Sequence, residues 1–322
     1  MLKKGKVLVI TDLCDVRLRN RYGLEQLKSS GFEVSIEREI KLKSYRNSHF
    51  IIEILPPGLK LFLVVMIAKL LNKRVFHYRL GSLPIKSSGN NVLKKISFNK
   101  VVDKIFSYLV FYDIVLLSNE AIILKAHEIL PANSFCVDEI KRLKPNIKAN
   151  QRVVYIDQFL DGHPEIHRFG HKIENSNYLF KVNEIITNSK YKNHPIMFAP
   201  HPERTNWENV PKDFILGEKS TLDLIAESEI IVGHFSTALQ YAVYLGKKVV
   251  ILPLNDLIHN RYSTASIQLS NGYGIPCANS SKDLDDIMFD SRHRYNGKLL
   301  TTTTGDTKNF DILYSKINEI LS

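Results

Sequence analysis

The segment Ser228–Leu252, with the sequence SEIIVGHFSTALQYAVYLGKKVVIL, contains a complete strand–turn–helix–strand pattern. Its apolar run Glu229–Val232 predicts a buried strand. Helical spacing over Thr237–Leu245 predicts a helix that Gly246 ends, and Lys248–Leu252 predicts the next strand. A strand, a helix and a second strand in this order are typical of a parallel sheet with helices packed on its faces.

The same alternation runs through the rest of the chain. In the first half we expect strands at Lys6–Ile10, Phe32–Ile36, His49–Leu55, Arg74–Tyr78 and Asp113–Leu117, and helices at Arg21–Ser30 and Leu59–Leu71. In the second half we expect further strands at Val153–Ile156 and Ile196–Ala199, and helices at Ile173–Asn188, Asp283–Phe289 and Phe310–Leu321. We therefore predict the α/β class, with two Rossmann-like doubly wound domains that face a central cleft and bind ligands at the carboxyl ends of their strands.

The domain boundary is expected in the polar, proline-containing stretch Arg142–Arg152. This places an acceptor-binding domain at residues 1–147 and a nucleotide-sugar-binding domain at residues 148–322. The length of 322 residues agrees with two domains, since one domain commonly takes about 100–200 residues.

Composition excludes several classes of protein. With 44% hydrophobic and 24% charged residues, the chain is neither a disordered tail nor a collagen-like rod nor a small disulfide-stapled fold. The three cysteines, Cys14, Cys136 and Cys277, lie far apart and form no zinc-binding spacing, which fits a reducing cytoplasm. The most apolar segment, Leu59–Leu71, is shorter than the about 20 residues that a bilayer requires. A cytoplasmic protein without a signal peptide is expected.

Positive charge is concentrated in the first half of the chain. The net charge is +11, yet residues 1–150 hold 26 basic and 13 acidic residues, against 18 and 20 in the remainder. Residues 54–102 contain no acidic residue. This half is expected to meet an acidic glycan, a lipid headgroup or a nucleic acid, unless the charge only keeps the surface soluble. Peripheral attachment to the inner membrane face follows as a hypothesis, because each Lys or Arg near an anionic surface contributes about 1 kcal/mol.

The turn GHFST between the first strand and the helix of Ser228–Leu252 is a candidate anion site. Gly233 allows close approach of a ligand to the backbone, and His234 in the same turn is expected to contact the donor. Ser236 or Thr237 is expected to cap the helix, whose exposed N–H groups and dipole attract phosphate. The alternative is that Ser236 only caps its own helix.

A second candidate is the segment Pro195–Arg204, with the sequence PIMFAPHPER. A buried strand ends here in His201, which Pro202 helps to fix, and Arg204 can contact a phosphate through two N–H groups. His-Pro also occurs at residues 163–164 and 194–195, so the context rather than the dipeptide singles out His201. A purely structural histidine is the alternative.

APHPER followed by GHFSTA resembles the His-Pro and Ser/Thr motifs of bacterial sialyltransferases, in particular glycosyltransferase family 52 and the capsular polysialyltransferases. The resemblance is specific over about residues 150–255 and general elsewhere. It implies a GT-B fold and inverting transfer of a sialic acid or related nonulosonate from a CMP-activated donor to a capsule or lipopolysaccharide acceptor. It also implies that His201 binds the CMP phosphate and that Ser236 with Thr237 binds the nucleotide.

The general base is less clearly indicated. The family carries two acidic residues followed by glycine in its N-terminal domain, and no such triplet occurs between residues 80 and 150. Asp138, followed by Glu139, is the nearest substitute; Asp12 follows the first strand, and Asp157 ends the first strand of the second domain. A carboxylate on the acceptor side must accept the hydroxyl proton. Each of the three can instead be a cap or turn residue.

No metal or other cofactor is expected beyond the CMP-activated sugar, which is a substrate. No DxD triplet follows a strand, and one phosphodiester can be neutralised by His201 and the helix terminus. An acidic or lipid-linked glycan acceptor is expected to meet Arg17, Arg19, Arg79 and Ser82, the last in a Gly/Ser/Asn-rich loop, although each arginine singly is as well explained by solvation.

Two alternatives remain open. The same architecture can use another donor, either a UDP-sugar or CDP-glycerol in teichoic-acid-type synthesis. A different class is a non-catalytic basic module for nucleic acid or anionic membrane. Because no RNP motif or GXXG loop in context occurs, a nucleic acid partner is not expected.

Overall fold

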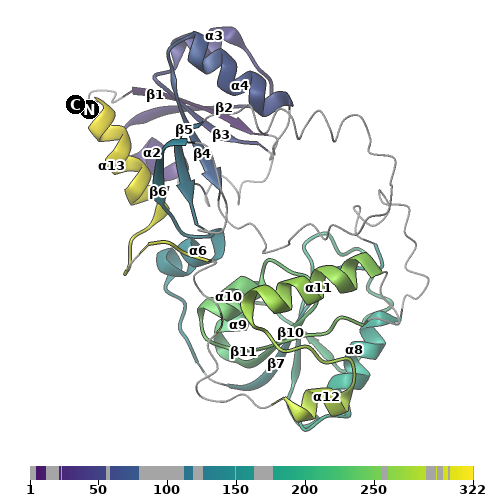
Figure 1. Ribbon diagram of the computed structural model, residues 1–322. Coiled ribbons are helices and arrows are strands. Elements are labelled where there is room, and N and C mark those ends of the chain that lie inside the picture. The colour runs from purple at the N-terminus through teal and green to yellow at the C-terminus, as the bar shows by residue number, and fades with distance from the viewer. Residues whose placement is uncertain are drawn as a thin grey trace. The chain divides into compact units, whose positions relative to one another are not determined.

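The computed structural model contains two compact units of parallel α/β structure (Figure 1). It describes residues 5–11, 22, 24–55, 59–79, 112–118, 126–148, 150–162, 177–254, 260–287, 295, 300–303 and 305–321. Within these ranges, unit 1 runs to Arg142 and resumes at Leu300, and unit 2 lies between them.

Unit 1 is built on a six-stranded sheet whose neighbouring strands all run parallel, in the order β2-β1-β3-β4-β5-β6. The strands are β1 Gly5–Thr11, β2 Phe32–Glu37, β3 Phe50–Ile54, β4 Arg74–Arg79, β5 Tyr112–Leu117 and β6 Ala126–Pro131. Both faces of the central strands are buried: Val7 and Val9 point into one core, and Leu8 and Ile10 point into the other. This explains why the strands read as continuous apolar runs.

Helices cover both faces of this sheet. The helices are α2 Leu24–Ser29, α3 Leu42–Asn47, α4 Leu59–Leu70, α6 Phe135–Leu143 and α13 Asn309–Leu321. Leucines of α2 pack with Leu313 and Ile317 of α13 on one face, and Tyr45 of α3 packs with the buried side of α4 on the other.

Unit 2 holds a five-stranded parallel sheet in the order β11-β10-β7-β8-β9. The strands are β7 Asn150–Ile156, β8 Ile196–Ala199, β9 Phe214–Leu216, β10 Ser228–Gly233 and β11 Lys248–Ile251. The helices are α8 Tyr178–Thr187, α9 Thr221–Glu227, α10 Leu239–Tyr244, α11 Asn260–Tyr273 and α12 Ser281–Asp286.

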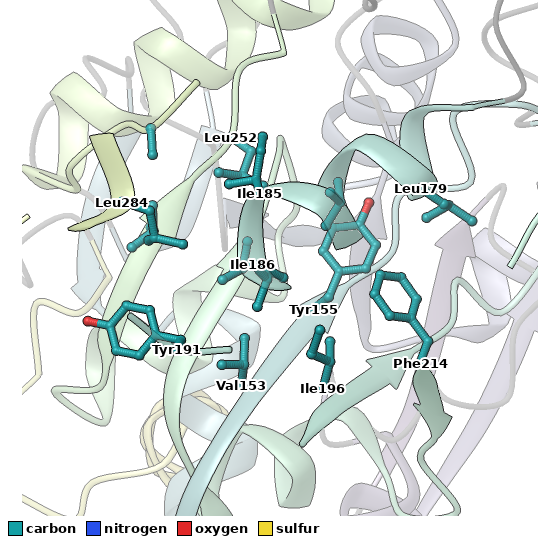
Figure 2. Packing of buried hydrophobic residues seen from close by; sticks show 14 of the residues in the cluster. Val153, Tyr155, Leu179, Ile185, Ile186, Tyr191, Ile196, Phe214, Leu252 and Leu284 are labelled. Carbon is teal, nitrogen blue, oxygen red and sulfur yellow. The ribbon is translucent and has the colours of Figure 1, made fainter. Parts of the chain in front are cut away.

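Figure 2 shows part of the core of unit 2, where Ile185 and Ile186 of α8 lie among Val153, Tyr155 and Ile196 of the sheet. Because the chain adds β8 and β9 on one side of β7 and then β10 and β11 on the other, the strand order reverses between β7 and β10.

The predicted α/β class is confirmed, but the predicted extent of the second domain is wrong. The chain enters unit 2 at Leu143, and residues from Leu300 onward return to unit 1. Leu313 and Ile317 are fully buried against the first sheet, and α13 lies beside α2 (Figure 1). A helical pattern shows which side of a helix is apolar but not which core receives it.

None of the described helices is both long enough and apolar enough to span a bilayer.

Candidate functional site

The candidate site lies at the carboxyl edge of the unit 2 sheet, where the strand order reverses. Val232 of β10 is in register with Tyr155 of β7, which is in register with Phe198 of β8. The three strands therefore end in one row, and the turns that follow them start at the same edge. Because β10 and β8 are two strand spacings apart, about 10 Å separates the turns at residues 234–238 and 200–204 at their starts. Open α/β sheets bind ligands at such a reversal point.

A buried ion pair supports the turn that follows β7. Asp157 accepts hydrogen bonds from Arg204, with Oδ2 at 2.5 Å from Nε and Oδ1 at 3.1 Å from Nη2. Arg204 also reaches Asp161 at 2.9 Å, and Asp157 accepts from the hydroxyl of Tyr178 at 2.8 Å. The side chains of Asp157 and Arg204 are inaccessible to solvent, and the guanidinium lies 4.9 Å from the centroid of the Phe159 ring. This network rigidly joins two of the turns at the edge.

These contacts contradict the predicted roles of Asp157 as base and Arg204 as phosphate ligand. Burial acts to raise the pKa of Asp157, but the hydrogen bonds and charge of Arg204 outweigh it and hold the pKa below its ordinary value. A carboxylate with a lowered pKa that is enclosed with a cation is a poor proton acceptor. The two side chains are joined in a buried ion pair that shapes the loop.

The loop from Asp157 to Gly162 holds a strained residue at the site. Phe159 adopts a positive φ of 50°, a left-handed conformation that aromatic residues rarely take. Its ring lies 6.3 Å from that of His201, roughly parallel to it. Gly162 is required here, because a Cβ atom at this position would approach the Phe159 ring to 2.3 Å.

His201 is positioned from two sides. Its backbone N–H donates to Oδ2 of Asp157 at 3.2 Å, and its ring Nδ1 accepts from the backbone N–H of Glu203 at 3.2 Å. Since Nδ1 is an acceptor, the neutral imidazole carries its proton on Nε2. The side chain is partly exposed, and the neighbouring Pro202 is exposed. His201 thus has the tautomer that donates a hydrogen bond through Nε2.

His234 has a structural role that contradicts its predicted contact with the donor. It is 1% exposed, and its Nδ1 donates to the carbonyl of Leu252 at 2.5 Å while its Nε2 accepts from the hydroxyl of Tyr155 at 2.8 Å. Burial lowers the pKa of His234 to about 4, although the bond to Leu252 opposes the shift. The neutral ring therefore joins the ends of β10, β7 and β11.

The turn after β10 differs from the predicted helix start. The α-helix begins at Leu239 instead of Thr237, and Oγ of Ser236 accepts from the N–H of Ala238 at 3.2 Å. Ser236 is 9% exposed and stabilises this turn, but the N-cap of α10 is Ala238, so the alternative that Ser236 caps its own helix is not met either. Thr237 is exposed. At Gly233 a Cβ would lie 3.2 Å from Leu239, so this glycine makes room for the protein's own helix. Of the polar side chains at positions 236 and 237, that of Thr237 is the one at the surface.

Asp138 in unit 1 also contradicts its predicted role as a base. It is 8% exposed, and Oδ1 accepts from the N–H of Asn309 at 2.7 Å at the start of α13. Burial raises the pKa of Asp138, partly opposed by the bonds from Asn309 and Asn133 and by the charges of Arg142 and Lys141. Its carboxylate anchors the C-terminal helix.

The side chains of the other site residues predicted in the first half of the chain are not described by the structure. Asp12, Arg17, Arg19 and Ser82 lie outside the described residues, and of Arg79 only the backbone, at the end of β4, is described.

A buried polar pair in unit 1 was missed by sequence reasoning. Glu53 of β3 and His77 of β4 face each other in register and share a hydrogen bond, with side chains 0% and 1% exposed. Glu53 also accepts from the N–H of Leu55 at 2.6 Å, and Tyr112 stacks on His77 with ring centroids 4.3 Å apart. The available signal was a single ionisable residue within each of the apolar strands FIIEI and RVFHYR.

Across the part of the chain that the structure describes, no group of three or more His, Cys, Asp or Glu side chains is arranged to hold a metal ion.

Comparison with known proteins identifies solved structures that have a similar architecture. No family model matches the chain, and no curated protein matches it either. Solved structures are similar over almost their full length. The wall teichoic acid polymerase TagF, as its H444N variant, is 10% identical with a TM-score of 0.57, covering 99% of this chain and 90% of that one. The UDP-GlcNAc 2-epimerase from Methanocaldococcus jannaschii, in complex with UDP-GlcNAc and UDP, is 12% identical with a TM-score of 0.51, covering 97% and 99%. S. aureus MnaA with UDP is 10% identical with a TM-score of 0.53, covering 98% and 97%.

The chain has the GT-B fold. The GT-B fold is the one that the motif resemblance implies. At 10–12% identity, the similarity to these solved structures concerns the fold alone.

Proposed function

We propose that this GT-B protein is a glycosyltransferase that binds a nucleotide-activated donor at the carboxyl edge of the unit 2 sheet. The observation that carries the proposal is the register of β10, β7 and β8, which brings His201 and the Thr237 turn to the point where the strand order reverses. Nucleotide-sugar complexes among proteins of the same fold, such as the epimerase with UDP-GlcNAc and UDP, support this class of ligand.

In the proposed mechanism, His201 acts on the leaving group. The acceptor hydroxyl oxygen attacks the anomeric carbon, the bond from that carbon to the phosphate oxygen breaks, and the nucleotide departs with the electron pair. The Nε2–H of His201, the Thr237 hydroxyl and the backbone N–H groups of the turn would stabilise the negative charge that develops on the phosphate. The contact with Asp157 holds the backbone of His201, and the N–H of Glu203 holds its imidazole in the required tautomer before the donor arrives.

The base that receives the acceptor proton must lie elsewhere. Asp138 and Asp157 are engaged in buried contacts, which leaves Asp12, the next residue in the sequence after β1, as the remaining candidate of the three. Arg17, Arg19, Arg79 and Ser82 stay our candidates for an acidic or lipid-linked glycan acceptor. Metal-independent inverting transfer stays part of the proposal.

The first donor candidate is a CMP-activated sialic acid or related nonulosonate, with a capsule or lipopolysaccharide glycan as acceptor. Its support is the pair of motifs APHPER and GHFSTA. The second candidate is a UDP-sugar or CDP-glycerol, and the similarity in fold to the wall teichoic acid polymerase TagF supports it. Cytoplasmic location with peripheral attachment to the inner membrane is proposed for either donor.

Thermal unfolding with CMP, CDP and UDP tests the proposal. A donor site predicts that one nucleotide raises the midpoint in a concentration-dependent way. A rise in the midpoint with CMP alone would favour the nonulosonate donor. A rise with CDP or UDP would favour the second candidate. The His201→Ala variant should lose part of this shift. Salt-dependent binding of any oligonucleotide, with no response to the three nucleotides and no sugar transfer, would replace the proposal with a non-catalytic basic module.

A further inference from the structure

Helix α4 of unit 1 carries apolar side chains on two opposite sides, but the described part of the molecule buries only one of them. Its inner side chains, Leu61, Val64, Val65 and Ala68, pack into the core between the sheet and α3. Its outer side exposes four large apolar residues: Leu59 by 45%, Leu63 by 41%, Met66 by 40% and Leu70 by 79%. Their spacing of four, three and four residues puts them in one row along the helix.

The neighbouring helix also exposes a large apolar residue. Helix α3 lies beside α4 (Figure 1) and exposes Leu42 by 54%. We call Leu42, Leu59, Leu63, Met66 and Leu70 the outer apolar face. Scattered single leucines on a surface need no explanation, but a row along one helix indicates a site where something docks.

The charges near Leu42 are mainly basic. Lys41 precedes α3, and Lys43 and Arg46 lie on it, whereas Glu37 accepts a hydrogen bond from Ser44 of α3 and Glu39 is exposed. At the end of α4, Lys69, Lys73 and Arg74 line an open pocket of about 620 Å³ at the amino edge of the sheet.

The acidic residues of this pocket are already engaged. Oδ2 of Asp113 accepts from the N–H of Val75 at 3.1 Å, and Glu128 forms an ion pair with Lys316 at 2.9 Å. Lys73 also donates to the carbonyl of Arg46 at 3.4 Å. With three basic side chains and two carboxylates in its lining, the pocket carries a net positive charge that suits an anion.

We propose that the outer apolar face docks onto an anionic lipid bilayer and that the pocket at the end of α4 receives a lipid phosphate. At 12 residues α4 is too short to cross a bilayer, but its apolar row can enter the headgroup boundary while the lysines contact anionic lipid. A second copy of this chain would bring an equally basic surface against the first. The inference deepens the peripheral attachment given under the proposed function, and it depends on the surface of unit 1 and not on the donor site of unit 2.

The test is co-sedimentation of the full chain with vesicles of phosphatidylcholine alone or mixed equally with phosphatidylglycerol. Binding to the mixed vesicles, weakened by salt, is expected for the unmodified protein. The variant Lys69→Gln with Lys73→Gln should lose about 25-fold in affinity at low salt, since each lysine contributes about fivefold. The variant Leu63→Gln with Met66→Gln should lose binding at low and high salt alike, because it removes apolar insertion.

Matched variants of unit 2 serve as controls. Ile215→Gln with Leu216→Gln replaces two residues that are 49% and 53% exposed, and Lys192→Gln with Lys212→Gln removes two exposed charges. Both should bind like the unmodified protein. Equal binding by all variants, or equal binding to neutral and anionic vesicles, overturns the proposal. Light scattering gives a further test. If the unmodified protein is a dimer and only the variant Leu63→Gln with Met66→Gln is a monomer, the outer apolar face is a dimer interface and the proposal is overturned. The nucleotide response of unit 2, measured on the same variants, reports separately on the donor site.

Discussion

At the residue scale, two histidines that the sequence places in equivalent positions after strands have opposite environments. His201 follows β8, is partly exposed and has its tautomer set by the N–H of Glu203. His234 follows β10 and is buried between Tyr155 and Leu252. The first can serve a ligand and the second holds strand ends together, so replacing each should change different properties.

Replacing His201 should affect catalysis and spare the fold. In His201→Ala we expect the transfer rate to fall by about 10²–10³, the usual result of removing one donor to a developing oxyanion. The thermal midpoint should change little because the ring is not part of a core. His194→Ala is the matched control, since it alters another His-Pro pair at the amino end of the same strand. Full activity in His201→Ala, measured by transfer of labelled sugar, would refute its role.

Protonation of His234 should make stability depend on pH. Its pKa is about 4 in the folded state and 6.5 in the unfolded state, so its contribution is complete above pH 6.5 and is lost as the pH falls toward 4. Over that range we expect the free energy of unfolding to decrease by about 3 kcal/mol. Urea titrations between pH 7 and pH 4 measure this. In His234→Gln the slope should flatten; an unchanged slope in this variant would contradict the assignment.

At the element scale, the Glu53–His77 pair connects β3 to β4 within an otherwise apolar layer. Glu53→Ala should reduce the free energy of unfolding by about 3–5 kcal/mol, because it leaves His77 and the N–H of Leu55 without their acceptor. Glu53→Gln retains an acceptor for Leu55 and should cost less. Denaturant titration of the two variants measures the difference, and equal stability of Glu53→Ala and the unmodified protein would show that the pair does not support the sheet.

At the scale of the whole molecule, the C-terminal helix belongs to unit 1 although its sequence follows unit 2. Leu313→Ala should destabilise unit 1 by about 2–5 kcal/mol, the usual cost of emptying a buried leucine site. Hydrogen exchange should accelerate in β1 to β6 and remain slow in β7 to β11. Leu284→Ala, at a buried site in the core of unit 2, should give the reverse pattern. Faster exchange in both sheets for either variant would show that the two units unfold together.

Much of the architecture could be predicted because local pattern carries it. The strand Ile196–Ala199 was predicted at its observed bounds, and Leu59–Leu71 differs from α4 by one residue. Buried parallel strands read as apolar runs whichever neighbours they pair with. Strand β6 was missed because it lies at the sheet edge, where exposed and half-buried side chains alternate along AHEILP.

The site was only partly predictable, since the sequence cannot show which charges neutralise one another. Asp157 and Arg204 were both expected to face a ligand, and the fold instead closes them into a pair across 47 positions of the chain. By itself, the sequence determined the α/β class, the strand-end placement of His201 and the concentration of basic charge in the first half. Only the tertiary structure decided that Asp138, Asp157, Arg204 and His234 are structural and that α13 returns to unit 1. The physical reason is that burial and ion pairing depend on neighbours distant in sequence, whereas strand and helix patterns depend on residues close in sequence.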